Sequence, residues 1–370
     1  MTARERAGLY VHVPFCLTRC GYCDFNTYAG LDHLQGGYVA ALEREAALQA
    51  EAWADLELVS VFFGGGTPTM LAPETIVRLL IEFERSFRLA DGLEITVESN
   101  PDTVDRMSLG ELRAGGVNRL SIGVQSFDAR VLGVLERVHS AESARRAFRA
   151  ARRAGFDNVN LDLIYGANGE TIESWQRTLN EAASLAPEHV SAYALTIEPA
   201  TLLGRKVAAG VVPAPDPDVQ ADMYEAACEA LGRAGYEHYE VSNWDRPGHR
   251  SMHNLGYWEG RPYLGLGAGA HSYRGGRRWW NVRPPQEYMR QLEVGRLPLG
   301  GEELLSEEDH RLERMLLGFR TGQGVRVDGL DAERVAAFVS AGLAERRNGH
   351  VSLTERGMFL ANDIVLELMM

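Results

Sequence analysis

Hydrophobic and polar positions alternate in blocks along the first two hundred residues. Six short runs rich in β-branched and other apolar residues predict buried strands, and amphipathic stretches with helical spacing separate them. Nearly continuous apolar strands that alternate with helices are typical of a parallel sheet built from βα units. The predicted strands are 9–13, 56–63, 93–98, 117–124, 158–164 and 189–196, and the predicted helices are 35–53, 73–88, 103–114, 141–154 and 171–185.

Six βα units are fewer than the eight that close a full barrel. We therefore expect the α/β class, with a partial and open parallel (β/α)6 barrel of the TIM type over residues 1–235. Residues 236–300 are expected to form an extension that packs on the barrel, with irregular structure over 254–280. Residues 301–370 predict a small helical module, and the helix, hairpin and helix around 343–354 make it winged-helix-like.

Acidic residues outnumber basic ones along the whole chain and in this last module. The net charge is −13, and residues 301–370 contain eight arginines, no lysine and thirteen acidic residues. A nucleic-acid-binding protein usually carries a basic surface. We therefore expect a structural or docking module and no nucleic-acid partner. Lys206 is the only lysine of the chain, which we interpret as a bias of composition.

The sequence shows neither a membrane-spanning segment nor a signal peptide. No run approaches the ~18 apolar residues of a membrane span, and the first residues lack the apolar core of a signal peptide. We expect a cytoplasmic protein with at most peripheral membrane association.

Three of the four cysteines lie within eight residues, directly after the first predicted strand. Cys16, Cys20 and Cys23 form a C-x3-C-x2-C motif, whereas Cys228 stands alone in a predicted helix and is expected to be a core residue. A structural zinc site needs four protein ligands, and no second pair of ligands accompanies this motif. Three thiolates on one loop suit a [4Fe–4S] cluster that keeps one iron open to another ligand.

Glycines and polar residues follow the ends of the later strands. Gly64, Gly65 and Gly66, followed by Thr67, end the second strand, where a backbone without Cβ atoms can approach a ligand. Glu98 and Gln125 lie at the ends of two further strands. Because ligand sites of parallel βα folds are built at the carboxyl ends of strands, we expect these positions to converge.

Asp162 differs from these residues because it lies inside its predicted strand. A buried carboxylate needs a partner there, and we expect Arg137 to supply it.

These motifs together resemble radical S-adenosylmethionine (SAM) proteins, and over the whole chain the oxygen-independent coproporphyrinogen III oxidase group. The resemblance implies that SAM binds the open iron and that reduction of the cluster cleaves SAM. It further implies an electron donor for the cluster. The residues that the resemblance assigns to SAM are Tyr10, Gly65, Gly66, Thr67, Glu98, Gln125, Arg137 and Asp162.

Two features favour the branch of HemW-type haem chaperones within this group. True oxidases extend the cysteine motif to C-x3-C-x2-C-x-C, but Phe25 stands at the last position here. In addition, 253–258 reads His-Asn-Leu-Gly-Tyr-Trp and matches the H-N-x-x-Y-W motif of the chaperones. The resemblance implies a carrier that transfers haem to acceptor haemoproteins without oxidase turnover. The alternative is an enzyme that oxidatively decarboxylates coproporphyrinogen III.

The same motif supplies a candidate haem site, namely His253, Asn254, Tyr257 and Trp258. Imidazole is a usual ligand of haem iron, and aromatic rings pack on a porphyrin. We expect Gly256 to allow a turn that brings His253 and the aromatic residues to one pocket without a regular helix.

Other residues compete for roles in a haem site. His12, His33 and His271 are rival iron ligands, although we expect His271 near SAM. Arg277 and Arg278 would meet haem propionates or lie exposed on an edge strand.

Overall fold

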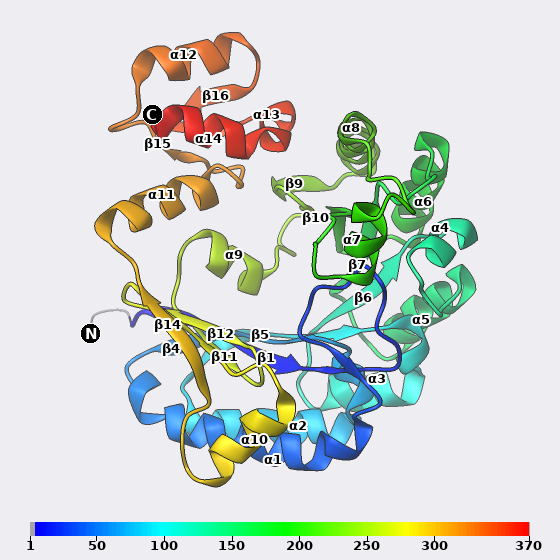
Figure 1. Cartoon of the computed structure of the whole chain (residues 1–370), viewed down its shortest axis with the longest axis vertical. Coiled ribbons are helices and arrows are strands. Elements are labelled where there is room, and N and C mark those ends of the chain that lie inside the picture. Colours follow the sequence, from blue (N-terminus) through cyan, green and yellow to red (C-terminus); the bar gives the residue numbers. More distant parts are fainter. Residues whose placement is uncertain (1–3, 370) are drawn as a thin grey trace.

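The computed structural model describes residues 4–369, and one long curved sheet dominates it (Figure 1). Its twelve strands run in the order β14-β13-β12-β11-β1-β4-β5-β6-β7-β8-β10-β9. Helices cover the outer side of the curve, whereas the short helix α9 (Met252–Trp258) lies on its inner side. The two edge strands, β14 and β9, do not pair with each other, so the barrel is open, as the sequence predicts.

The centre of the sheet confirms the six predicted parallel strands. They are β1 (Arg6–Val13), β4 (Glu57–Gly65), β5 (Leu89–Ser99), β6 (Arg119–Gln125), β7 (Val159–Tyr165) and β8 (His189–Ala194). Every neighbouring pair among them is parallel.

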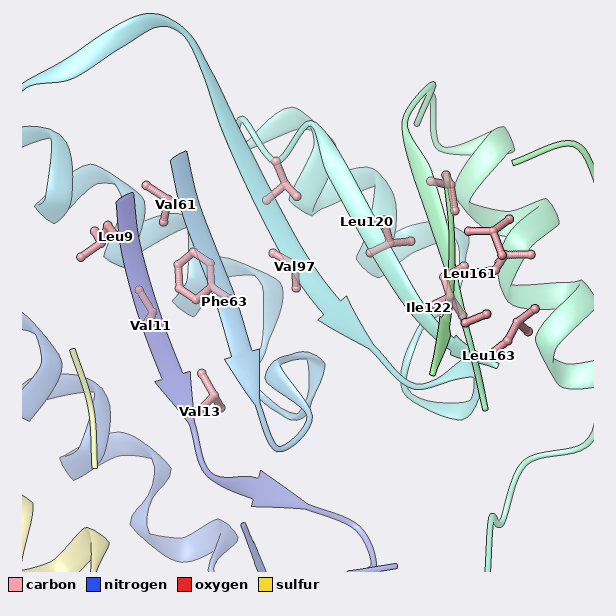
Figure 2. Packing of buried hydrophobic residues seen from close by; sticks show 14 of the residues in the cluster. Leu9, Val11, Val13, Val61, Phe63, Val97, Leu120, Ile122, Leu161 and Leu163 are labelled. Atoms are coloured by element: carbon pink, nitrogen blue, oxygen red, sulfur yellow. The ribbon is translucent and has the colours of Figure 1, made fainter. Parts of the chain in front are cut away.

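Side chains alternate between the two faces of these strands. Figure 2 shows Leu9, Val11 and Val13 of β1 in the buried cluster, and these side chains are fully buried. The residues between them, such as Tyr10 and His12, have the opposite orientation because successive strand side chains point to opposite faces. The apolar set packs against the helices and forms the core, and the other set lines the inner side, where the candidate site lies.

Several helices of the barrel begin with ordinary capping signals. Ser140 accepts a hydrogen bond from the amide of Ser143 at the start of α5, and Thr171 accepts one from Ser174 at the start of α6. The helices are α1 (Gln35–Gln49), α2 (Pro73–Ser86), α3 (Arg106–Ala114), α4 (Ala129–Val134), α5 (Ala141–Arg153), α6 (Ile172–Leu185), α7 (Leu202–Ala208), α8 (Pro217–Arg233) and α10 (Pro285–Glu293).

The prediction of irregular structure over 254–280 is wrong, because α9 and three sheet strands occupy this segment. The strands are β11 (Tyr263–Leu266), β12 (His271–Arg274) and β13 (Arg277–Asn281). A Gly275-Gly276 pair with φ of +58° and +81° joins β12 to β13, and such a pair is a strong signal for a tight hairpin. Arg277 and Arg278 therefore lie on an inner strand, since β14 (Leu299–Leu304) pairs with β13 on its far side.

At the other end of the sheet, β9 (Glu237–Glu240) and β10 (Asn243–Asp245) add antiparallel strands to β8. The predicted boundary at residue 300 falls inside β14, which continues the main sheet to Leu304.

The last part of the chain is the small winged-helix-like module that the sequence predicts. It contains α11 (Glu307–Gly318), β15 (Val325–Arg326), α12 (Ala332–Ser340), β16 (Ala344–Arg347), β17 (His350–Leu353), α13 (Glu355–Phe359) and α14 (Ala361–Met369). It sits beyond β9 (Figure 1), where the amide of Gly322 donates to the carbonyl of Tyr239. Within residues 4–369, no helix is both long and apolar enough to cross a membrane.

Candidate functional site

The three clustered cysteines lie on the loop that follows β1. Two neighbouring segments hold the middle of this loop: the amide of Gly21 donates to the Glu136 carboxylate at 2.8 Å, and the carbonyl of Gly21 accepts from the amide of Leu203 in α7 at 2.8 Å. Cys16 begins the loop in the short strand β2 (Phe15–Cys16), which pairs with β3 (Tyr28–Ala29) at the end of the loop. The loop is thus anchored at its ends and at its centre.

All three thiols are half-buried and none forms a disulfide. Partial burial raises the pKa of Cys16 and of Cys23, and the neighbouring cysteines raise both further. Three thiolates would therefore repel one another unless positive charge lay between them. Among the described residues, three metal-binding side chains have donor atoms within 4.8 Å of one another only at Cys228, His238 and Glu355, and the clustered cysteines do not form such a group. The three sulfur atoms are thus more widely spread than a single ion requires, which suits the separate iron corners of a [4Fe–4S] cluster.

The glycines after β4 pack against this loop. A Cβ atom on Gly66 would lie 2.6 Å from the carbonyl oxygen of Phe15, and one on Gly65, where φ is +108°, would lie 2.4 Å from the ring of His12. The amides of Gly66 and Thr67 donate to the carbonyls of Val13 and Phe15. The glycines are needed for the close approach of two protein segments, and not only for a ligand as the sequence suggested.

Polar side chains connect the glycine segment to the cysteines. Thr67 Oγ1 lies 3.7 Å from Cys16 Sγ and accepts a hydrogen bond from Asn100 Nδ2 at 2.9 Å. Asn100 Oδ1 accepts from Arg137 Nη2 at 2.5 Å, and Arg137 Nη1 donates to Cys20 Sγ at 3.5 Å. Sequence reasoning missed Asn100, although its position directly after β5, before a proline, is a signal for a turn that ends a strand.

The predicted pairing of Asp162 with Arg137 is wrong. Asp162 accepts hydrogen bonds from Ser121 Oγ at 2.7 Å and from Asn160 Nδ2 at 2.8 Å. These partners are on β6 and β7 beside it, whereas Arg137 points to the cysteine loop. Burial raises the pKa of Asp162, and Ser121 and the charge of Arg119 oppose that rise.

Glu98 and Tyr10 line the same cavity on the inner side of the sheet. The Gly65 amide donates to Glu98 Oε2 at 3.2 Å. Burial, with a contribution from Asp162, raises the pKa of Glu98 to about 8. The Tyr10 hydroxyl donates to Nδ1 of His12, since His12 Nε2 donates to the Asn26 carbonyl.

Gln125 and Glu136 share an unusual backbone conformation. Their φ values are +63° and +53°, which non-glycine residues seldom adopt and which often marks a functional segment. Gln125 ends β6 beside the site. Glu136, which sequence reasoning missed, holds Gly21 and also pairs with Lys206 at 3.2 Å. The only lysine of the chain therefore lies beside the cysteine loop.

A cavity of about 600 Å³ opens beside Tyr10 and Glu98 on the inner side of the sheet. Tyr10, Gly65 and Glu98 form one part of its wall. The rest comes from His12 of β1, from the cysteine loop and from the segment between α9 and Arg283, and it combines aromatic side chains with polar ones. The lining residues are Tyr10, His12, Asp24, Phe25, Asn26, Gly65, Glu98, Tyr257, Tyr263, Gly269, Ala270, His271, Trp280 and Arg283.

The histidine of the H-N-x-x-Y-W motif lies in the core behind this cavity. His253 is buried, its Nδ1 lies 2.9 Å from Ser60 Oγ, and its Nε2 lies 2.9 Å from the Tyr257 hydroxyl. The ring stacks on Phe62 with a centroid distance of 5.0 Å. Burial lowers its pKa to about 3. The space beside it measures about 10 Å³, so neither ring nitrogen is open to an iron atom in this conformation.

The prediction of a turn at Gly256 is also wrong, because the motif lies in helix α9. Ser251 caps that helix by accepting from the Asn254 amide. Helical spacing places His253 and Tyr257 four residues apart on one face, which explains their hydrogen bond. Of the four motif residues, Tyr257 alone lines the 600 Å³ cavity, and Asn254 and Trp258 do not.

The remaining candidates separate clearly. Arg277 pairs with Glu302, and Arg278 pairs with Glu303 and Glu313, so neither is free to bind a ligand. His12 and His271 line the cavity, whereas His33 is exposed elsewhere. Cys228 is buried in α8, as the sequence predicts for a core residue.

Comparisons with known proteins agree with this geometry. Residues 10–182 match the model of the Radical SAM superfamily, and residues 305–360 match the HemN C-terminal domain. A heme chaperone HemW of Mycobacterium tuberculosis is 42% identical over 98% of this chain and 94% of its own length. The heme chaperone HemW of Bacillus subtilis is 35% identical over 96% and 97%.

A solved structure is also similar over nearly the whole chain. The coproporphyrinogen III oxidase HemN of Escherichia coli, described as a radical SAM enzyme, has a TM-score of 0.83 and 26% identity, and the match covers 98% of this chain and 89% of that one. The matches thus cover the barrel and the C-terminal module together. The chain belongs to the HemW family of radical SAM proteins.

Proposed function

We propose that the protein is a haem chaperone, which binds haem in the 600 Å³ cavity and transfers it to acceptor haemoproteins. The names of its relatives from M. tuberculosis and B. subtilis support this assignment. Phe25 supports it as well, because a phenylalanine in place of a fourth cysteine leaves a large apolar side chain, 62% exposed, on the cavity wall.

The resident cofactors are a [4Fe–4S] cluster on Cys16, Cys20 and Cys23 and a SAM molecule beside it. The half-buried thiols without a disulfide fit a cluster. We assign SAM to Tyr10, Gly65, Gly66, Thr67, Glu98, Gln125, Arg137 and Asp162, and the presence of Tyr10, Gly65 and Glu98 on one cavity wall supports the assignment. Once bound and reduced by an electron donor, the cluster would supply the electron that cleaves SAM.

The protein's own residues prepare this site before any cofactor arrives. Arg137 places a positive charge beside Cys20 and donates a hydrogen bond to its Sγ. Thr67 holds Cys16 from the other side of the loop. Glu98, protonated near neutral pH because its pKa is about 8, can donate a hydrogen bond to the cofactor as well as accept one from Gly65.

The aromatic cavity is the observation that carries the proposal. Trp280, Tyr257, Tyr263 and Phe25 line a space that adjoins the cofactor residues and opens to solvent. A porphyrin is flat and apolar, and such ligands bind in clefts with mostly aromatic walls and few polar groups. Tyr257 belongs to this wall, and we propose that His253 holds the Tyr257 hydroxyl in position instead of meeting the iron.

The likeness to HemN supports a second candidate, a coproporphyrinogen III oxidase. Its substrate is also a tetrapyrrole with acidic side chains, so the same cavity would accept it. The two candidates differ in what the protein does with the ligand: a chaperone releases it unchanged to another protein, whereas an oxidase removes carboxyl groups.

One anaerobic experiment separates them. The reconstituted protein is mixed with haem, and separately with coproporphyrinogen III, SAM and a reductant. We expect a Soret band that moves to an apo-haemoprotein added later, and no protoporphyrinogen IX. Turnover of coproporphyrinogen without stable haem binding would contradict the chaperone and favour the oxidase. The control is Cys20→Ser, which should lose any turnover that depends on the cluster.

A further inference from the structure

One histidine of the cavity wall stands out by its position. His271 is the first residue of β12 and lies opposite Trp280 of β13 in the hairpin register. The two rings stack with a centroid distance of 5.4 Å and an angle of 25° between their planes. Stacking on a strand residue fixes the orientation of the imidazole, so the cavity presents it as a rigid group.

Unlike the other two histidines at this face, His271 has free nitrogens. Both ring nitrogens of His12 and of His253 are taken up by hydrogen bonds within the protein. Over residues 4–369, His271 has no hydrogen-bonding partner for its ring, and its side chain is exposed. Partial burial, together with the charges of Arg278 and Arg283, lowers its pKa. The imidazole is therefore neutral near pH 7 and offers a lone pair, which is the form that binds a metal.

A free cation lies on the same wall. Arg283 is exposed in the cavity, and within the described part of the chain its guanidinium has no carboxylate partner. Its backbone carbonyl accepts hydrogen bonds from Asn26 Nδ2 at 2.8 Å and Tyr28 at 3.3 Å, which fixes the base of the side chain. Arginine without a partner beside an open cavity suits a carboxylate ligand, because guanidinium and carboxylate form paired hydrogen bonds.

We infer that His271 is the axial ligand of the haem iron and that Arg283 binds a haem propionate. Trp280 then holds the imidazole by stacking on it, and Phe25 packs on the macrocycle. The inference rests on the proposed haem-binding function and names its ligands. Coordination transfers no electron: the imidazole lone pair fills an open position on the iron and displaces water or another weak ligand.

The first test is a haem titration of the full-length protein followed by the Soret band. His271→Ala should weaken haem binding at least about tenfold and shift the band, since an axial imidazole bond is lost. Added imidazole should restore the position of the band. His33→Ala removes an exposed histidine outside the cavity and serves as the matched control, with unchanged affinity and spectrum.

A parallel titration of His253→Ala compares the motif histidine. We expect the variant to keep the spectrum of imidazole-bound haem even where its affinity falls, because Tyr257 loses its support. If His271→Ala keeps the wild-type band and affinity, the ligand assignment is wrong. If the wild-type protein binds no haem at all, the proposed function itself fails, so the two failures are distinguishable.

The role of Arg283 has its own readout. Arg283→Ala should reduce affinity for haem about tenfold but leave affinity for haem dimethyl ester unchanged, because the ester lacks the negative charges. Arg283→Lys should restore part of the loss. An equal loss for haem and its ester would show that Arg283 supports the wall and does not bind a propionate.

Discussion

The two halves of the candidate site are built in opposite ways. In the half around the cysteines, polar side chains are already paired: Thr67 with Asn100, Asn100 with Arg137, and Arg137 with Cys20. In the half formed by β12, β13 and the residues that follow β13, His271 and Arg283 line the cavity without such partners in the described chain. A preorganised network suits a cofactor that stays, and unpaired groups on an open wall suit a ligand that comes and goes. We call these regions the cofactor half and the cargo half.

The largest expected effect tests whether the two halves are separable. Cys20→Ser removes one of three cluster ligands, and we expect the loss of essentially all bound iron, about four per chain in the wild type. Haem affinity should remain within about twofold, since the cargo half shares none of these ligands. Iron analysis and a Soret titration measure both. Cys228→Ser, in the core of α8, is the control and should keep the cluster.

Loss of haem binding together with the cluster would break the comparison, because it would show that the cluster itself forms part of the haem site.

The next effect concerns how tightly the cofactor half is packed. Gly66→Ala forces a Cβ atom to within 2.6 Å of a backbone oxygen, and we expect it to reduce the free energy of unfolding by about 2 kcal/mol. Gly110→Ala is the matched control. Gly110 lies inside α3 with nothing near its missing Cβ, so the same change should stabilise by about 0.5–1 kcal/mol. Denaturation of the cluster-free proteins measures both, and equal effects would contradict the packing argument.

A smaller effect depends on pH and reports the burial of Glu98. Its pKa is about 8 in the folded protein and near 4.5 in an exposed carboxyl group. The unfolded chain therefore loses its proton first, and the folded protein loses stability as the pH rises from about 4.5 through 8. Glu98→Gln removes this penalty. Relative to the wild type, the variant should gain about 1.4 kcal/mol for each pH unit between pH 5 and 8 in the cluster-free state.

Thermal unfolding of both proteins across this pH range measures the difference. A constant difference would show that Glu98 is ionised at all these pH values and that the cofactor half is wetter than its contacts indicate.

The smallest effect separates the clamps on the cysteine loop. Lys206→Met breaks the pair with Glu136, whose side chains are 40% and 41% exposed. Such pairs contribute little, so we expect less than about 0.5 kcal/mol of stability and an unchanged iron content. Glu136→Ala also removes the hydrogen bond to Gly21 and should lower the iron content. If the lysine variant matches the alanine variant, the ion pair is the stronger clamp.

The sequence was sufficient for the framework because strand patterns are local. Alternation along β1 separates Leu9 and Val11, which join the core, from Tyr10 and His12, which face the site. The spacing of the cysteines likewise needs only eight residues. The glycines after β4 were also recognisable from the sequence as a site of close approach. The segment that approaches Gly66 is the protein's own backbone.

The contacts that sequence reasoning missed join residues far apart in the chain. Asn100 meets Arg137, and Glu136 meets Gly21, and no periodicity links such positions. The helix at 252–258 was missed for a different reason, since Gly256 suggested a turn whereas the capping serine at 251 predicts a helix start. The missed helix also explains the wrong role given to His253. On the buried face of α9 its ring nitrogens pair with Ser60 and Tyr257 and are not open to a haem iron.

Because Lys206 is the only lysine of the chain, its side chain can be labelled selectively. It supplies the only side-chain amine among 370 residues, and its partial exposure leaves it accessible to reagents that acylate amines. A fluorophore attached there would sit beside Glu136 and the cysteine loop. Iron–sulfur clusters and haem both absorb strongly in the visible range, so the emission of a single dye would report the filling of the cofactor half and the arrival of cargo as they happen.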